Sequence, residues 1–205
     1  MTRCLKPLAA LSAALTLSAC TVLPESQPPR IVDLAVNGEH PVYDRPRPES
    51  LRVDLPRASA PFDSNLVLIQ PSRWEFQALP DTRWRTDLPM LVHDQLVQSL
   101  RETKGFNNVL TTNSAANADI SILSELRGFH ARKTAGSTRV VIQLYYELLN
   151  NRSRETLCVL DEKQVVSAEN SDLANLMAAF SQGISRVATN TARWAFSCLE
   201  KHNPG

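Results

Sequence analysis

Residues 118–150 read ADISILSELRGFHARKTAGSTRVVIQLYYELLN and set the architecture of this 205-residue chain. Two apolar runs flank the small-residue turn at 135–137, which predicts a long β-hairpin. In the second run one face carries Val140, Ile142, Leu144, Tyr146 and Leu148, and the other carries Val141, Tyr145 and Leu149. A strand that is apolar on both faces is central in its sheet, or its outer face contacts another molecule.

Shorter strands are predicted on both sides of this hairpin. Upstream, LRVDLP (51–56), NLVLIQ (65–70) and WEFQA (74–78) form three strands that read as a meander, with Trp74, Phe76 and Ala78 pointing inward. Residues 107–112, NNVLTT, add another short strand. Downstream, ETLCVLDEKQVVS (155–167) predicts a second hairpin with its turn at 161–163.

Two segments have the apolar period of a helix. The first, at 86–106, carries Leu88, Leu91, Val92, Leu96 and Leu100 on one face. Thr86 or Asp87 is expected to cap its start, and Gly105 to take the left-handed position after its end. The second begins near an expected N-cap at Ser171 and continues for about 25 residues, with Gly183 as a weak point.

These elements predict an α+β domain. Its sheet is mostly antiparallel, two main helices pack on one face of the sheet, and the second helix is long and C-terminal. We expect this domain to span residues 50–202.

The first nineteen residues have the layout of a secretory signal. Arg3 and Lys6 precede an apolar run at 8–17, which is far too short for the roughly 20 apolar residues of a spanning helix. The run ends in Leu-Ser-Ala-Cys, and this sequence resembles the lipobox of bacterial lipoproteins. We therefore predict that residues 1–19 are removed and that Cys20 is lipidated; the alternative is an ordinary secreted protein with an incidental cysteine.

Residues 20–49 are rich in proline and polar residues, which predicts an extended spacer between the lipid and the domain. Within this spacer, residues 31–34 are apolar. They either add an edge strand to the sheet or belong to an unstructured tether.

Cys158 and Cys198 remain after the signal and the lipidated cysteine are set aside. An even pair in an exported protein predicts a disulfide, and two buried free thiols are the alternative. The bridge would also exclude a thiolate nucleophile at either position.

Charge and motifs exclude several classes of function. The mature chain is close to neutral, because losing Arg3 and Lys6 changes the balance from 22 basic against 21 acidic residues to 20 against 21. Nucleic acid is therefore not expected as a partner, and attraction to anionic lipid is not indicated. None of the motifs of hydrolases, metalloproteases or nucleotide-binding proteins occurs. His40, His93, His130 and His202 lack the spacing of metal ligands, so we predict neither an enzyme nor a bound cofactor or metal.

The features that carry a family resemblance are the lipobox, the strand LRVDLP, the long hairpin, the closing helix and the segment FQALPDTRWRTDLPMLVHDQLVQSLRETKGFNNVL (76–110). Through these features the chain resembles the ABC-type transport auxiliary lipoprotein family, whose members include the PqiC-like outer-membrane lipoproteins. In that family a tryptophan precedes the leucine-rich helix, and Trp84 takes this place here. The similarity covers roughly residues 50–200.

The resemblance implies a docking protein for an ABC permease and ATPase that work with a periplasmic MCE-type subunit and move phospholipids or other hydrophobic molecules. The docking protein would be anchored to the membrane by its lipid. Whether it forms a homo-oligomer is left open. Thr21, in the place where aspartate would retain a lipoprotein at the inner membrane, suggests the periplasmic face of the outer membrane. Candidate partner-binding residues are Val141 and Tyr145 on the second face of the central strand, and Trp84, for which a role in holding the helix start is the alternative.

Two other functions remain as alternatives. One is a structural or assembly lipoprotein of the envelope with no link to a transporter. The other is a hydrolase whose catalytic residues meet only in the folded chain.

The lipid anchor is testable by mass spectrometry of the protein purified from membranes. We expect the amino-terminal peptide to begin at Cys20 and to carry a diacylglycerol and a further acyl chain. An unmodified amino terminus would contradict the prediction.

Overall fold

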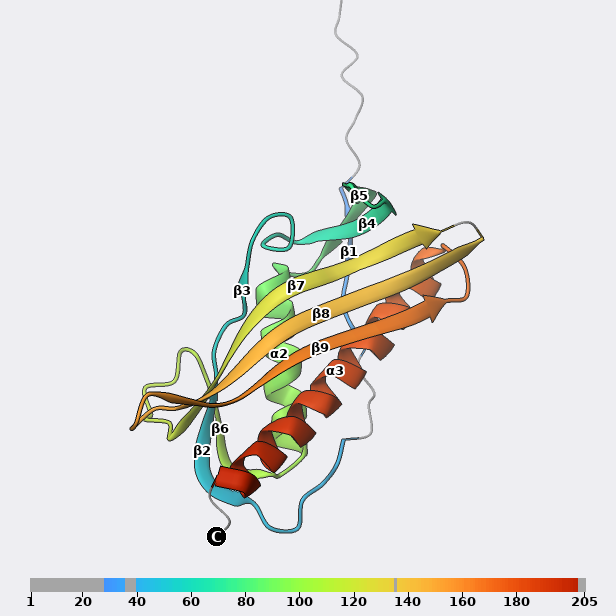
Figure 1. Ribbon diagram of the computed structural model, residues 1–205. Helices are drawn as coiled ribbons and strands as arrows, with labels where there is room; N and C mark the ends of the chain where they lie inside the picture. Colours follow the sequence, from blue (N-terminus) through green and yellow to red (C-terminus); the bar gives the residue numbers. More distant parts are fainter. Residues whose placement is uncertain (1–27, 36–39, 135, 203–205) are drawn as a thin grey trace, which may run out of the picture.

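The computed structural model of the chain describes residues 28–35, 40–134 and 136–202. One large sheet forms the first layer, and helices α2 (Leu88–Glu102) and α3 (Leu173–His202) form the second layer on one face of that sheet (Figure 1). The predicted α+β class is confirmed, including the long C-terminal helix. The longest ladders of the sheet are antiparallel, whereas its parallel pairings are short.

Strand β7 (Ile120–Thr134) organises the sheet. Along one edge it pairs antiparallel with β8 (Ser137–Asn150) over the whole length of both strands, so the predicted long hairpin is confirmed. Its other edge is shared, in turn, by β2 (Arg47–Val53), β3 (Arg57–Ala58) and β4 (Leu66–Ser72), all of them parallel to β7. The strands that precede α2 in sequence thus pair with the β7–β8 hairpin, which follows α2.

The predicted meander is wrong. Only β4 and β5 (Glu75–Trp84) pair as an antiparallel hairpin, whereas β2 lies between β7 and β6 (Phe106–Thr111) and is parallel to both. Trp74, Phe76 and Ala78 are exposed rather than inward. The alternation of this segment reads as a half-buried strand, but helices cover the sheet only farther along β5, at Trp84.

The second predicted hairpin is also absent. Residues Glu155–Ala168 form one continuous strand, β9, antiparallel to β8, and 161–163 lie in its middle. The turn lies earlier, at residues 151–154, where Arg154 has a φ of 63°. The charged residues of β9 misled the sequence prediction because the outer face of this strand is solvated.

The two helices meet the sheet much as their apolar stripes predict. Asp87 occupies the N-cap of α2 without a side-chain hydrogen bond, and the amide of Leu88 donates instead to the carbonyl of Ser64. The left-handed residue after α2 is Lys104, with a φ of 52°, and not Gly105. A Cβ at Gly105 would lie 2.9 Å from the ring of Tyr43, so the position is limited by space.

Gly183 also marks a close approach. A Cβ at this position of α3 would lie 2.9 Å from the terminal methyl of Ile142 in β8. The glycine that the sequence marks as a weak point of the helix therefore lets the helix cross the sheet closely.

Part of the predicted spacer belongs to the domain. Residues Arg30–Val32 form β1, an edge strand parallel to β5, which is the first of the two alternatives for this segment. Farther along, the ring of Tyr43 stacks on Phe196 of α3, with 3.7 Å between the centroids. The folded unit thus begins before residue 50.

An aromatic cluster joins the two layers of the core. Trp84 from β5, Phe129 from β7 and Phe180 from α3 are fully buried, and their ring centroids lie 5.0–5.6 Å apart. The three rings are 45 and 51 residues apart along the chain, so the cluster links segments that are far apart in sequence.

Replacing Phe180 with alanine should remove the part of this cluster that the helix supplies. We expect Phe180→Ala to lower the free energy of unfolding by about 3–5 kcal/mol, the usual cost of deleting a large buried ring. Chemical denaturation measures the loss. The matched control on the same helix is Gln182→Ala, an exposed position that should change stability by no more than about 0.5 kcal/mol.

Candidate docking surface

Of the three predicted partner-binding residues, only one remains at the surface. Trp84 is 1% exposed and Val141 is 3% exposed, whereas Tyr145 is partly exposed on the face of the sheet away from the helices. Trp84 and Val141 are therefore not available to a partner in this fold. Trp84 does not act at the surface because its ring is enclosed by Phe129 and Phe180 in the core.

Val141 is buried although it points away from the helices. It lies opposite His130 in the β7–β8 ladder, and the rings of Phe62 and Phe76 pack on His130 at centroid distances of 6.0 and 5.1 Å. Burial, together with the nearby charge of Arg132 and Lys163, lowers the pKa of His130 to about 4. A neutral imidazole thus completes a small apolar cluster on the outer face.

Tyr145 lies in a groove on the outer face of the sheet. The groove has a volume of about 640 Å³, and β3, β7 and β8 supply its walls. We define the Tyr145 groove by Arg57, Ser59, Glu125, Arg127, Tyr145 and Glu147.

The guanidinium of Arg127 lies 4.6 Å from the centroid of the Tyr145 ring. Its Nη2 also donates to Glu125 Oε2 at 2.8 Å, so the cation is held over the ring by a carboxylate on the same strand. These bonds raise the pKa of Arg127. Tyrosine and arginine are enriched at the centres of protein interfaces, because both combine a large contact area with directed polar groups.

The rest of the outer face is mixed. Val159 and Val165 on β9 are exposed, but Asp161 and Lys163 separate them on the same face of the strand. The outer face therefore offers isolated apolar contacts among charges rather than one broad apolar patch.

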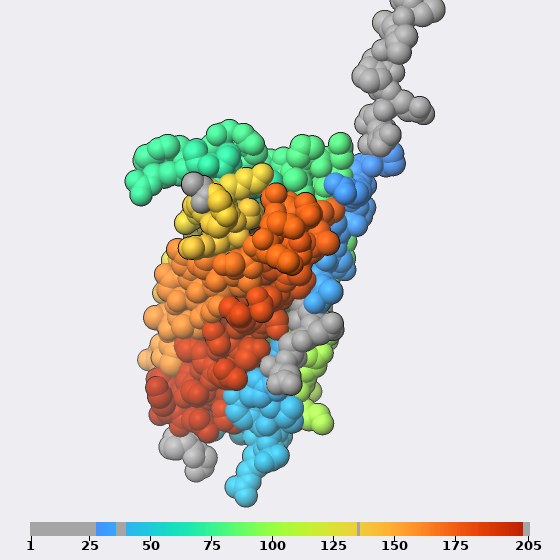
Figure 2. Space-filling model, turned by 90° about the vertical axis from the view of Figure 1, so that its right-hand side faces the viewer, coloured from blue at the N-terminus to red at the C-terminus, as the bar shows by residue number. Residues whose placement is uncertain are grey.

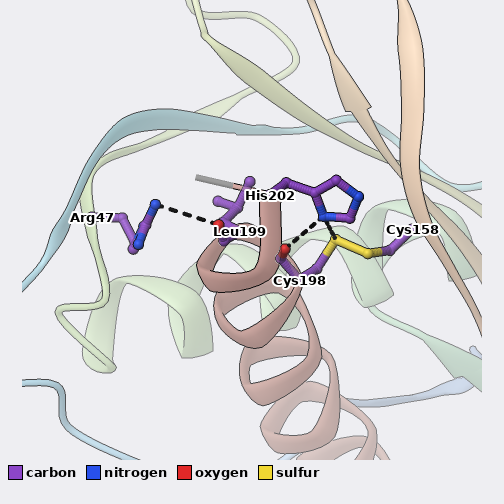
Figure 3. Close-up of a disulfide and its surroundings, with 5 residues drawn as sticks. All are labelled: Arg47, Cys158, Cys198, Leu199 and His202. Atoms are coloured by element: carbon purple, nitrogen blue, oxygen red, sulfur yellow. Dashed lines mark hydrogen bonds between the residues drawn. A yellow bond between two sulfur atoms is a disulfide. The ribbon is translucent and has the colours of Figure 1, made fainter. Parts of the chain in front are cut away.

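The structure joins Cys158 of β9 to Cys198 of α3 by a disulfide, with 6.3 Å between the Cα atoms (Figure 3). His202 lies one helical turn after Cys198, and its Nδ1 donates to the Cys198 carbonyl at 2.9 Å. Among the described residues, these three are the group that could come close enough to share a metal ion. Because both sulfurs are bonded to each other, they are not thiolate ligands, and we assign the group a structural role.

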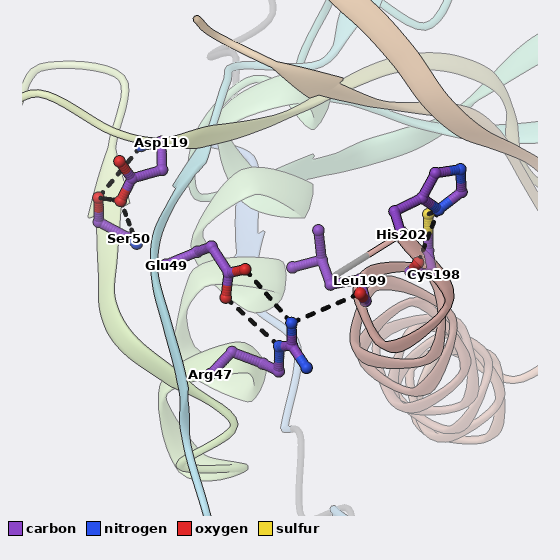
Figure 4. Close-up of polar contacts among 7 residues, drawn as sticks. All are labelled: Arg47, Glu49, Ser50, Asp119, Cys198, Leu199 and His202. Carbon is purple, nitrogen blue, oxygen red and sulfur yellow. Dashed lines mark hydrogen bonds and ion pairs between the residues drawn. The ribbon is translucent and has the colours of Figure 1, made fainter. Parts of the chain in front are cut away.

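Polar contacts near this disulfide tie β2 to its neighbours (Figure 4). Arg47 is 3.3 Å from Glu49 and donates to the Leu199 carbonyl at 3.4 Å, close to the end of α3. Asp119 accepts from both the amide and the hydroxyl of Ser50, and these bonds lower the pKa of Asp119. Together they fix the start of β2 against the last turn of the helix and the start of β7.

His93 belongs to α2. It is buried, and its Nε2 donates to the Val53 carbonyl at 3.2 Å, so it links α2 to β2. Sequence reasoning missed the Tyr145–Arg127 pair, since the two residues come from different strands. Cys20, the predicted lipidation site, lies outside the described residues.

The profile of the family described as "ABC-type transport auxiliary lipoprotein component" matches residues 34–192. The chain belongs to this family, which is a family of transport auxiliaries and not of enzymes. A search of curated protein sequences found no match.

Solved structures share the fold. A protein of Xanthomonas campestris from the DUF330 family is similar with a TM-score of 0.79 at 18% identity, over 86% of this chain and 99% of that one. A second crystal structure, of an uncharacterised protein, gives a TM-score of 0.63 at 18% identity, over 82% and 98% of the two chains. A PelC dodecamer from Paraburkholderia phytofirmans is more distant, with a TM-score of 0.45 at 12% identity, over 74% of this chain and 89% of that one.

Within the described part of the chain, neither helix is long and apolar enough to cross a membrane.

Removing the disulfide should destabilise the protein. The bridge spans 40 residues of sequence, so in the chain-entropy model we expect Cys158→Ser/Cys198→Ser to lower the free energy of unfolding by about 3–4 kcal/mol. Urea denaturation with and without reductant measures this. The reductant should bring the wild type to the stability of the variant and leave the variant unchanged, and equal stability of all four samples would contradict the prediction.

Proposed function

We propose that this protein is an outer-membrane lipoprotein that docks the periplasmic MCE-type subunit of an ABC transport system for phospholipids or other hydrophobic molecules. Its membership of the transport auxiliary family carries the proposal, because it links the chain to an ABC transport system. The MCE subunit, the cargo class and the outer membrane are the proposed refinements.

The predicted amino terminus supports this role. A lipidated Cys20 followed by a proline-rich spacer would hold residues 50–202 beside the membrane, and residues 30–32 and 43 of that spacer lie against the domain. The domain would then have a limited range of orientations relative to the bilayer, as a docking protein requires.

The Tyr145 groove is the surface that we propose for the partner. It faces away from the helices, and it presents an aromatic ring under a guanidinium with carboxylates at its rim. Such a site suits a polar protein surface with a protruding side chain better than an acyl chain, because its walls carry charges.

The proposal is tested with a photo-crosslinking residue placed at position 145. We expect an adduct with the MCE-type subunit, identified by mass spectrometry, when the lipoprotein is expressed with its transport system. The matched control places the same residue at Arg193, which is exposed on α3 on the opposite side of the sheet and should give no adduct.

A second measurement uses Tyr145→Ala. Loss of a central interface aromatic should weaken retention of the MCE subunit on the purified lipoprotein by at least tenfold, since such residues contribute roughly 2 kcal/mol or more. A preparation of the wild-type protein that never retains an MCE subunit, permease or ATPase would contradict the transport role. It would favour the alternative of a structural envelope lipoprotein.

A further inference from the structure

One end of the molecule carries the β4–β5 hairpin together with the start of the described chain (Figures 1 and 2). Strand β1 begins at Arg30 beside Thr82 of β5, so the chain enters the fold at the base of this hairpin, whereas Trp74 lies at its tip. Cys20 is eight residues before Pro28, and eight extended residues span at most about 29 Å. If Cys20 is acylated as proposed, this end of the domain stays within that reach of the bilayer.

The tip of the hairpin presents an aromatic side chain to solvent. Trp74 is 87% exposed, the highest exposure among the large hydrophobic residues that the structure describes. It follows Ser72, the last residue of β4, by two positions, so no neighbouring strand covers it. A tryptophan ring prefers the boundary between acyl chains and water, where its apolar body and its N–H are both satisfied.

A groove lined by cations begins beside the tryptophan, at Arg73. The groove, of about 320 Å³, lies between the hairpin and the end of β7, and its described lining residues are Gln70, Ser72, Arg73, Arg132, Lys133 and Thr134. This lining contains three cations and no carboxylate. Arg132 is held in place by a hydrogen bond from its Nε to Gln70 Oε1 at 2.8 Å, and the guanidinium of Arg73 lies 5.7 Å from the Trp74 ring.

The whole chain is nearly neutral and so predicts no attraction to anionic lipid. The fold changes this locally. The parallel pairing of β4 with β7 brings Arg73 beside Arg132 and Lys133, although about sixty residues separate them in sequence. A cationic groove next to an exposed tryptophan is complementary to a surface of phosphate groups over acyl chains.

We propose that this end of the domain, the Trp74 end, docks on an anionic phospholipid bilayer. It comprises the groove residues and Trp74, with Trp74 entering the interface and Arg73 and Lys133 contacting lipid phosphates. The proposal rests on the acylation of Cys20 and deepens the proposed function, because it defines which end of the domain faces the membrane. The Tyr145 groove, on the outer face of the sheet, is then left open to a periplasmic partner.

The experiment uses the mature acylated protein reconstituted in vesicles whose acyl chains carry bromine, which quenches tryptophan fluorescence on contact. One set of vesicles contains phosphatidylethanolamine and phosphatidylglycerol, and the other contains phosphatidylcholine alone. The difference between the wild type and Trp74→Phe isolates the signal of Trp74 from that of Trp84 and Trp194. We expect Trp74 to be quenched in the anionic vesicles and much less in the neutral ones.

Charge variants then test the groove. Arg73→Gln/Lys133→Gln should lower the ratio of domains docked on the bilayer, with Trp74 quenched, to undocked domains. We expect a loss of about fivefold for each cation removed, since each basic residue near an anionic surface contributes on the order of 1 kcal/mol. The matched control, Arg152→Gln/Arg154→Gln, removes two exposed cations from the turn between β8 and β9 and should leave the ratio unchanged.

Unquenched Trp74 in anionic vesicles, or equal effects of the two charge variants, would overturn the proposal and would leave this end open to a protein partner. Mass spectrometry of the same sample reports the acylation of Cys20 separately. Because no transporter is present in the vesicles, failure of membrane docking is distinguishable from failure of the proposed transport role.

Discussion

The double pairing of β7 is the constraint on which the rest of the molecule depends. One edge of this strand is filled by β8, and the other is divided among β2, β3 and β4. A strand with both edges paired has its backbone groups satisfied and its register set from two sides, so it cannot slip without moving every side chain to the wrong face. The one irregularity in the β7–β8 ladder lies between Leu126 and Gly128, where a bulge bends the strand.

The helices pack on the sheet that β7 organises and complete the core. Phe129 of β7 lies against Phe180 of α3 and Trp84 of β5, and the disulfide holds the far end of α3 to β9. This arrangement covers one face of the central strands with helices, and most of the side chains between the two layers are apolar. Surfaces for other molecules therefore remain on the outer face of the sheet and at the two ends of the domain.

The two surfaces that we assign to function follow from this geometry. The Trp74 end carries the β4–β5 hairpin, and the chain enters the fold beside the base of this hairpin, whereas the Tyr145 groove lies on the outer face of the central strands. A domain that is tethered and oriented at one end can present its broad face to a periplasmic partner without losing contact with the bilayer. The family to which the chain belongs, described as a transport auxiliary lipoprotein component, is consistent with such an auxiliary role.

The outcome at particular residues shows how far the sequence alone could lead. Both helices, the long hairpin and the disulfide pair were predictable, because each depends on a local period, a turn or a count of cysteines. The β9 turn was misplaced because charged residues on a solvated strand face have the composition of a turn. Tyr145 was correctly placed on the outer face by alternation, whereas the burial of Val141 was not predictable from its own strand.

By itself, the sequence determined both helices with their apolar faces and the long hairpin, and it predicts the export signal, since these depend on residues that are close together in the chain. Only the tertiary structure decided that Trp84 is a core residue, that Arg127 lies over Tyr145, and that Arg73 joins Arg132 and Lys133 beside Trp74. Each of these depends on which strand lies next to β7. The strand neighbours of β7 are determined by the packing of side chains from distant segments, and no local sequence pattern predicts them.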